Sequence, residues 1–104
     1  MGDGTGEALQ QSVGIPWFLA PDYGQARELM LDRDTLPATF EDWLTQAEEV
    51  ERHVMASGCR PARAIIDPFE FSIWCRDAGL QPNGTARREF AAWVASRQVQ
   101  GYCP

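Results

Sequence analysis

The chain is expected to change from strand to helix within residues 60–71, which read RPARAIIDPFEF. Residues 62–66 end in two β-branched isoleucines, and Pro68 disfavours helical geometry at the residue before it, so this run predicts a strand. Asp67 stands where a helix N-cap would, followed by Pro68 at the first helical position and Glu70 at the third. A helix is therefore predicted to begin at Pro68, and the combination of strand and helix predicts an α+β fold.

Four short helices in all are predicted from capping residues and from apolar residues at helical spacing. Their expected ranges are residues 23–32, 40–57, 68–78 and 84–97. The expected N-caps are Asp22, Thr39, Asp67 and either Asn83 or Thr85, and the expected C-terminal stops are Gly58 and Gly79. The apolar side chains expected to face the core include Phe40, Trp43, Leu44, Ala47, Val50, Val54, Met55, Phe69, Phe71, Ile73, Trp74, Cys75, Ala78, Ala86, Phe90, Trp93 and Val94. The fold is thus expected to be mainly helical, with one or two short strands.

The predicted strand at 62–66 needs a partner, because a lone strand leaves its backbone donors and acceptors unpaired. Residues 13–19 could lie beside it as an edge strand, with Pro16 facing away from the ladder. Alternatively, the strand could pair antiparallel with its own copy across a two-fold axis, which would give an isologous homodimer. We favour the dimer, since the residues before Val13 offer little to anchor an intrachain strand and an interface would use the surplus of aromatic residues. The candidate interface residues are Ala62, Ala64, Ile65, Ile66, Trp17 and Phe18.

Length and charge indicate one globular domain in a soluble protein. The 104 residues are expected to comprise an N-terminal tail at 1–12, a single domain at 13–98 and a C-terminal tail at 99–104. Residues 1–59 hold three arginines and eleven carboxylates, a net charge of −8, whereas residues 60–104 hold six arginines and four carboxylates, a net charge of +2. The overall charge of −6 argues against broad attraction to nucleic acid or anionic membranes.

The chain carries no sequence signal for export or membrane insertion. No apolar run approaches the roughly 20 residues that span a bilayer, and the first residues lack a basic leader followed by an apolar segment. Three cysteines without a framework spacing favour a reducing compartment. We therefore expect a cytoplasmic protein without a membrane partner.

No residue pattern predicts catalysis or cofactor binding. The metal-ligand types His53, Cys59, Cys75 and Cys103 are 6, 16 and 28 residues apart, without the close cysteine pair of a zinc site. His53 is expected on the polar side of its helix, where it is more readily a solvated residue than a catalytic base for a cysteine or serine. We predict no catalytic, cofactor-binding or metal-binding residues.

The last two predicted helices superficially resemble a helix-turn-helix, with residues 79–82 as the turn. Arg87, Arg88 and Arg97 on the second of these helices could then contact nucleic acid. The acidic front half opposes such binding, because phosphate neutralisation supplies much of its affinity. An accessory nucleic-acid-binding protein is therefore the alternative function. The leading prediction is a non-catalytic protein-interaction module that self-associates.

Three motifs also resemble a family of short bacterial proteins of unknown function. They are LPATFEDWL at residues 36–44, IDPFEF at residues 66–71 and the pair Trp74-Cys75. The similarity would cover roughly residues 15–95. It implies a bacterial cytosolic protein and no particular activity, because the motifs consist mainly of capping residues and core aromatics.

Overall fold

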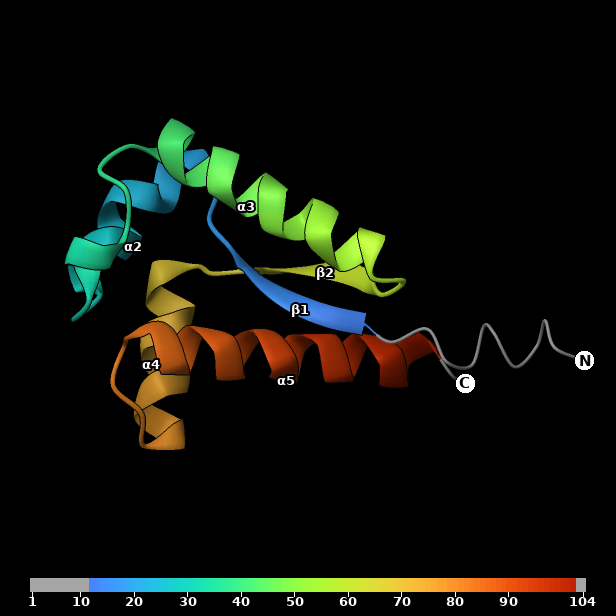
Figure 1. Ribbon diagram of the computed structural model, residues 1–104. Helices are drawn as coiled ribbons and strands as arrows, with labels where there is room; N and C mark the ends of the chain where they lie inside the picture. The colour runs from blue at the N-terminus through green and yellow to red at the C-terminus, as the bar shows by residue number, and fades with distance from the viewer. Residues whose placement is uncertain (1–11, 103–104) are drawn as a thin grey trace, which may run out of the picture.

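The computed structural model describes residues 12–102, with side chains as far as Arg97 (Figure 1). Its elements are β1 (Ser12–Trp17), a 3-10 turn (Ala20–Asp22), α2 (Tyr23–Leu29), a second 3-10 turn (Arg33–Thr35), α3 (Phe40–Ala56), β2 (Arg60–Ile65), α4 (Pro68–Ala78) and α5 (Gly84–Tyr102). The mainly helical α+β fold expected from the sequence is confirmed. None of the helices within the described residues is long and apolar enough to cross a membrane.

The two ends of the predicted domain differ from the expectation. Ser12, which was assigned to the N-terminal tail, is the first residue of β1. The C-terminal tail predicted from residue 99 is wrong for residues 99–102, which continue α5 because no proline or glycine interrupts the chain between Gly84 and Gly101. The rest of both predicted tails, residues 1–11 and 103–104, lies outside the described residues.

The two strands form a parallel sheet within one chain. The register pairs Ser12 with Arg60 at one end and Trp17 with Ile65 at the other. Parallel strands need a long crossover connection, and here the segment that carries α2 and α3 provides it. The strand predicted at 62–66 therefore pairs with the residues named as its intrachain alternative. This pairing corrects the favoured antiparallel one and removes the argument on which the dimer was based.

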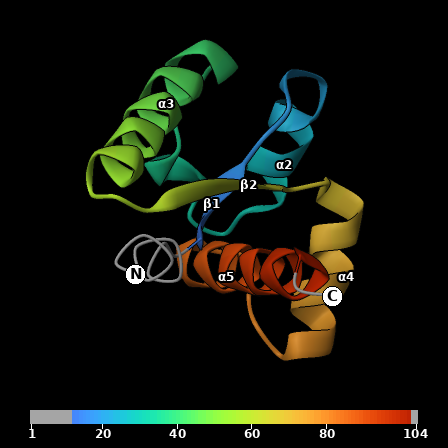
Figure 2. The ribbon, with the colours of Figure 1, turned by 90° about the vertical axis from the view of Figure 1, so that its right-hand side faces the viewer.

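Helices cover both faces of this sheet. Figures 1 and 2 show α3 over one face and α5 across the opposite one, with α4 beside one end of α5. Side chains alternate along β1, so that Trp17 contacts Trp43 of α3, with ring centroids 5.2 Å apart, while Gly14 lies against α5. A Cβ at Gly14 would be only 2.0 Å from the backbone oxygen of Ala91. The approach of α5 to β1 therefore depends on a glycine at this position.

Two aromatic clusters fill the space between the elements. The first joins α3 to β1 and α2 and consists of Trp17, Phe18, Tyr23, Phe40 and Trp43. The second joins α4 to α5 and consists of Phe71, Trp74, Phe90 and Trp93. Most rings meet edge to face, an arrangement that favours aromatic pairs beyond the area they bury. Trp93, which was expected to face the core, is 43% exposed because it closes the outer end of the second cluster.

Three of the predicted N-caps are confirmed. The amide of Asp42 donates to Thr39 Oγ1 at 3.2 Å, and the amides of Phe69 and Glu70 both donate to Asp67 Oδ1 at 3.0 Å. Asn83, rather than Thr85, caps α5, since its Oδ1 accepts from the amide of Ala86 at 3.0 Å. These side chains satisfy helical N–H groups that have no partner within the helix.

Both predicted C-terminal stops are also confirmed. Gly58 and Gly79 have φ angles of +88° and +71°, the left-handed region that glycine enters without strain. The amide of Cys59 donates to the carbonyl of Val54, and the amide of Leu80 donates in the same way to the carbonyl of Cys75. Each pair is the six-residue bond of a Schellman motif.

The predicted cap at Asp22 is wrong. Its side chain accepts no hydrogen bond from the first turn of α2, and its backbone is already helical, with φ −97° and ψ −11°. The 3-10 turn at Ala20–Asp22, which has Pro21 in its first positions, precedes α2 directly. Asp22 therefore continues a helical path instead of standing at its start, where an extended residue is required.

Four further residues expected in the core lie largely on the surface, and one of them is Ala78, at the end of α4. Val50 and Met55 on α3 are 50% and 53% exposed, because a sheet of two strands is too narrow to cover the whole apolar stripe of that helix. Phe69 is 71% exposed, since α4 packs through Phe71 and Cys75 instead. These residues are the first indication of where a partner could bind.

Each outer edge of the sheet carries one proline. The amide of Ile66 donates to the carbonyl of Trp17 at 2.8 Å, so the backbone groups of Trp17 face β2. Because these groups alternate along a strand, those of Pro16 face away from the ladder, as expected, and those of Pro61 do so on β2. A proline has no N–H to offer to a further strand, and such residues protect sheet edges from pairing.

We predict that Gly14→Ala destabilises the protein by about 3 kcal/mol or more, the upper range for overpacking, because the new methyl group meets backbone atoms of α5. Gly24→Ala in α2 is the matched control. A Cβ at Gly24 has no neighbour within 4 Å, and alanine is the better helix former, so stability should rise by up to about 1 kcal/mol. Urea unfolding of the two variants measures both effects, and equal stabilities would contradict the close packing at Gly14.

Candidate interaction surfaces

Most of the residues predicted to form an interface are buried within the chain itself. Only Ile65 of the six is exposed, at 42%. The other five have less than a tenth of their surface exposed: Trp17, Phe18, Ala62, Ala64 and Ile66. Their side chains are therefore occupied in the two faces of the sheet and in the aromatic cluster beside it.

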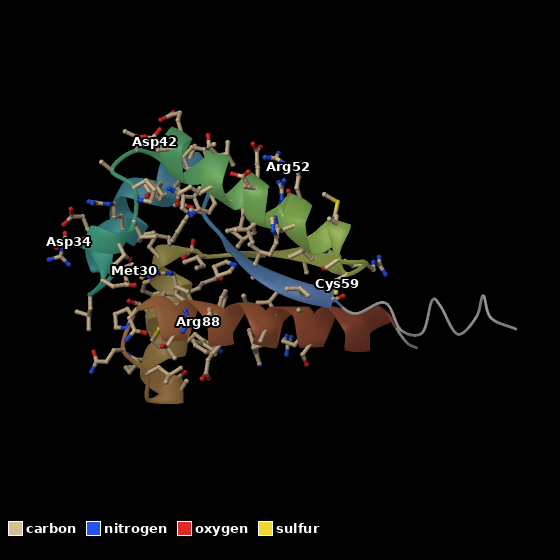
Figure 3. The ribbon with its side chains drawn as sticks, viewed as in Figure 1. Met30, Asp34, Asp42, Arg52, Cys59 and Arg88 are labelled. Atoms are coloured by element: carbon tan, nitrogen blue, oxygen red, sulfur yellow. The ribbon has the colours of Figure 1, made fainter. Side chains whose placement is uncertain are left out.

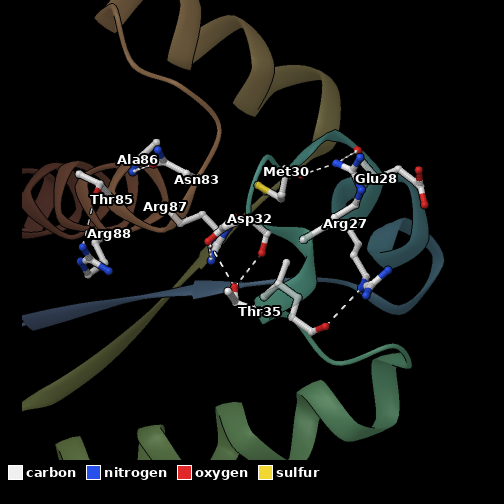
Figure 4. Close-up of polar contacts among 12 residues, drawn as sticks. Arg27, Glu28, Met30, Asp32, Thr35, Asn83, Thr85, Ala86, Arg87 and Arg88 are labelled. Carbon is white, nitrogen blue, oxygen red and sulfur yellow. Dashed lines mark hydrogen bonds and ion pairs between the residues drawn. The ribbon is translucent and has the colours of Figure 1, made fainter.

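The arginines predicted to contact nucleic acid have other partners. Arg87 forms two hydrogen bonds with the carboxylate of Asp32, at 2.9 and 3.0 Å, and its side chain is only 12% exposed (Figure 4). Arg88 donates to Thr85 Oγ1 at 3.3 Å, and the guanidinium of Arg97 lies 4.8 Å from the ring centroid of Trp93. Arg87 therefore joins α5 to the segment after α2 and is not available to a phosphate.

The residues of metal-ligand type do not form a cluster within the described residues. His53 is exposed on α3, Cys59 is partly exposed after that helix, and Cys75 is buried. Cys103 lies outside the described residues. Within the part of the chain that the structure describes, no group of three or more ligand-type side chains could hold a metal ion. Burial raises the pKa of the Cys75 thiol, which keeps it protonated at neutral pH and unsuited to nucleophilic attack.

Phe69 stands beside a hollow between α2 and α4. The hollow has a volume of about 410 Å³, and its lining residues are Gln25, Glu28, Leu29, Pro68, Phe69 and Ser72. We call this region the Phe69 surface. Asp67 fixes the first turn of α4 and thereby the position of Phe69, since its carboxylate accepts the Phe69 amide. The result is a projecting aromatic ring directly next to a hollow whose wall combines the apolar Leu29 and Pro68 with the polar Gln25, Glu28 and Ser72.

A second surface follows α3. Two hollows of about 500 and 450 Å³ share Gln46, and we call the pair the α3 groove. The first is lined by Asp34, Thr35, Leu36, Pro37, Ala38, Asp42, Thr45 and Gln46. The second is lined by Gln46, Glu49, Val50, His53 and Val54. Figure 3 shows Asp42 at the start of α3 and Asp34 on the segment that precedes it. The groove thus combines carboxylates with apolar side chains.

Sequence reasoning missed both surfaces. Phe69 and Val50 were assigned to the core because each belongs to an apolar stripe at helical spacing. On α4, Phe69 and Phe71 point in different directions, and the pattern alone does not decide which of the two is covered. The signal that was present is the number of apolar residues, which exceeds what a two-stranded sheet can bury.

Comparison with family models, with curated proteins and with solved structures finds no match to this chain. The resemblance of residues 36–44 and 66–71 to short bacterial proteins therefore stays a prediction from sequence motifs.

We predict that Asp32→Asn lowers stability at neutral pH by about 1 to 3 kcal/mol, because it breaks a charged hydrogen-bonded pair with an almost buried arginine. The hydrogen bond from Arg87 lowers the pKa of Asp32 below its ordinary value of 3.8. The stabilisation is therefore complete well above this value and is lost as the pH falls below it. The difference between wild type and variant should accordingly shrink on acidification.

Asp77→Asn is the control for this prediction. Asp77 lies 3.8 Å from Arg76, and both side chains are more than two thirds exposed, so the pair should contribute nothing measurable. Urea unfolding at pH 7 and pH 3 tests the two variants together. An Asp32→Asn protein as stable as wild type at pH 7 would contradict a structural role for Arg87.

Proposed function

We propose that this protein is a small, non-catalytic protein-interaction module that self-associates through the Phe69 surface. One observation carries the proposal: the 71% exposed ring of Phe69 beside a hollow that could receive a similar ring. Burying an exposed aromatic side chain is favourable by a free energy of about 1.5 to 3 kcal/mol. Exposed aromatic residues next to pockets are typical of the residues that dominate protein interfaces.

The arrangement of ring and hollow suits a two-fold dimer. In an isologous interface the same patch serves both copies, so each copy must offer both a projection and a cavity. The Phe69 surface has the two side by side, and a two-fold axis between them would place each Phe69 in the hollow of the other copy. The interface would thus use helix surfaces of α2 and α4 and leave the proline-bearing strand edges unpaired.

The charge of the chain predicts how such a dimer responds to salt. Each copy carries a net charge of −6, so two copies repel one another at low ionic strength. The attraction at the Phe69 surface is mainly apolar and is not weakened by screening. Self-association should therefore become stronger when salt is added.

We also propose a cytoplasmic location and no catalytic role. Cys59 and Cys75 are both free thiols, which is typical of proteins in a reducing compartment. His53 is exposed and has no thiol or hydroxyl partner in the described residues, so it lacks the geometry of an activated nucleophile pair. Nucleic-acid binding is the weaker proposal, since Asp32 holds Arg87 and the chain is acidic overall.

Phe69→Ser tests the self-association. We expect wild type to approach twice the chain mass of 11.6 kDa at high concentration, and the variant to remain at the mass of one chain. The substitution removes two buried rings from each dimer, so the dissociation constant of the dimer should rise at least tenfold. Light scattering coupled to size exclusion, at low and high salt, provides the measurement.

Met55→Ser is the matched control, because Met55 is also an exposed apolar residue, on a different helix. It should leave the dimer intact. At concentrations low enough for wild type to be a monomer, both variants should unfold at the wild-type temperature, since neither side chain is buried within one chain. A wild-type protein that stays monomeric up to millimolar concentration would contradict the proposal.

A further inference from the structure

We infer that the α3 groove binds a basic, partly apolar segment of a partner protein. The inference rests on the proposed function as an interaction module, but it concerns a different surface from that of Phe69. The two hollows of the groove share Gln46 and follow α3 from Asp42 to His53, about three helical turns or roughly 16 Å. An extended segment of about five residues has this length.

The charges of the groove select a basic occupant. Asp34, Asp42 and Glu49 line it, and none of the described lining residues is an arginine. The three carboxylates form no ion pair or side-chain hydrogen bond with the other described residues. His53, the one basic residue of the lining, is exposed at the far end. A segment that carries arginine or lysine would therefore supply the missing countercharges, whereas a phosphate backbone would be repelled.

The apolar residues of the groove favour apolar residues between the basic residues of the bound segment. Val50 is half exposed and adjoins Val54, while Leu36, Pro37 and Ala38 line the other hollow. Removing such side chains from water favours binding, and it requires an apolar residue in the occupant at the same place. The best occupant thus has one or two apolar residues flanked by cations.

The wall of the groove before α3 is held in place by α2. The hydroxyl of Tyr23 donates to the carbonyl of Pro37, and Nε of Arg27 donates to the carbonyl of Leu36 at 3.3 Å. Tyr23 itself is packed in the aromatic cluster against Phe40 and Trp43. A preformed wall reduces the ordering cost that a partner must overcome on binding.

A second copy of this chain is a poor occupant, because most of its arginines are already engaged. Those with partners within the described residues include Arg27, Arg33, Arg63, Arg87, Arg88 and Arg97. Each copy is also acidic overall. The charge of the groove therefore points to a different, basic protein.

Synthetic hexapeptides test the inference directly on the full chain. The probe is fluorescein-labelled Arg-Arg-Leu-Leu-Arg-Arg amide, compared with Arg-Arg-Ser-Ser-Arg-Arg and Glu-Glu-Leu-Leu-Glu-Glu. Fluorescence anisotropy should show saturable binding of the first peptide, weaker binding of the second and none of the third. Binding should weaken as salt is raised, because screening reduces the attraction between exposed charges. This trend is opposite to the one expected for the dimer.

Variants of the groove locate the binding site. The double variant Asp34→Asn, Glu49→Gln should bind the probe about three- to tenfold more weakly than wild type, as expected for the loss of two exposed charge pairs. Val50→Ser should lower the affinity for the probe to a similar extent. The controls are Glu48→Gln and Met55→Ser, which change an exposed carboxylate and an exposed apolar residue of α3 outside the groove. Both controls should bind the probe like wild type.

Three results would overturn the inference. One is the absence of probe binding up to about 1 mM, the weak end of specific recognition. Another is equal weakening by the groove variants and their controls. The third is displacement of the probe by an excess of unlabelled protein that carries Asp34→Asn, Glu49→Gln and Val50→Ser, whose own groove is impaired, because this would show that a second copy occupies the groove. The Phe69→Ser protein should bind the probe as wild type does, so peptide binding by the groove and self-association through Phe69 are tested independently.

Discussion

The close contact between Gly14 and Ala91 determines how the rest of the molecule is arranged. Because β1 has no side chain at this point, α5 lies directly on the strand, with only small residues between them. Ala62 and Ala64 continue this flat surface on β2, opposite the face on which Arg63 meets Glu51 of α3. The larger side chains of the sheet, Trp17 among them, are thereby directed to the α3 side, where the first aromatic cluster forms.

A sheet of only two strands then limits what the helices can bury. Parallel sheets are usually covered on both faces, and α3 and α5 provide that cover here. The apolar stripe of α3 is wider than the sheet beneath it, so Val50 remains half exposed. Pro16 and Pro61 stand on the two outer edges, where further strands would otherwise add. A partner is therefore more readily bound by helix surfaces than by strand pairing, which explains why an interface centred on the strand at 62–66 was not a sound expectation.

Capping residues and glycine stops predicted the structure better than the spacing of apolar residues did. The caps at Thr39 and Asp67 and the stops at Gly58 and Gly79 depend on hydrogen bonds within a few residues, so their pattern could be read directly. The pairing of the strands and the exposure of Phe69 depend on segments far apart in the chain, and apolar spacing does not say which of two overlapping faces is covered. Neither candidate surface could be identified before the packing of α2 against α4, and of α3 against the sheet, was known.

The uneven charge of the sequence also has a structural explanation. Arg63 and Arg87 of the basic half pair with Glu51 and Asp32 of the acidic half, so the fold uses part of the charge difference to join its elements. These pairs are partly shielded from water, and the hydrogen bonds they contain lower the pKa of both carboxyl groups. The carboxylates left without countercharges include those that line the α3 groove. The same distribution of charge that holds the two halves together therefore leaves an acidic surface along α3, and this surface is the one to which we assign a basic partner.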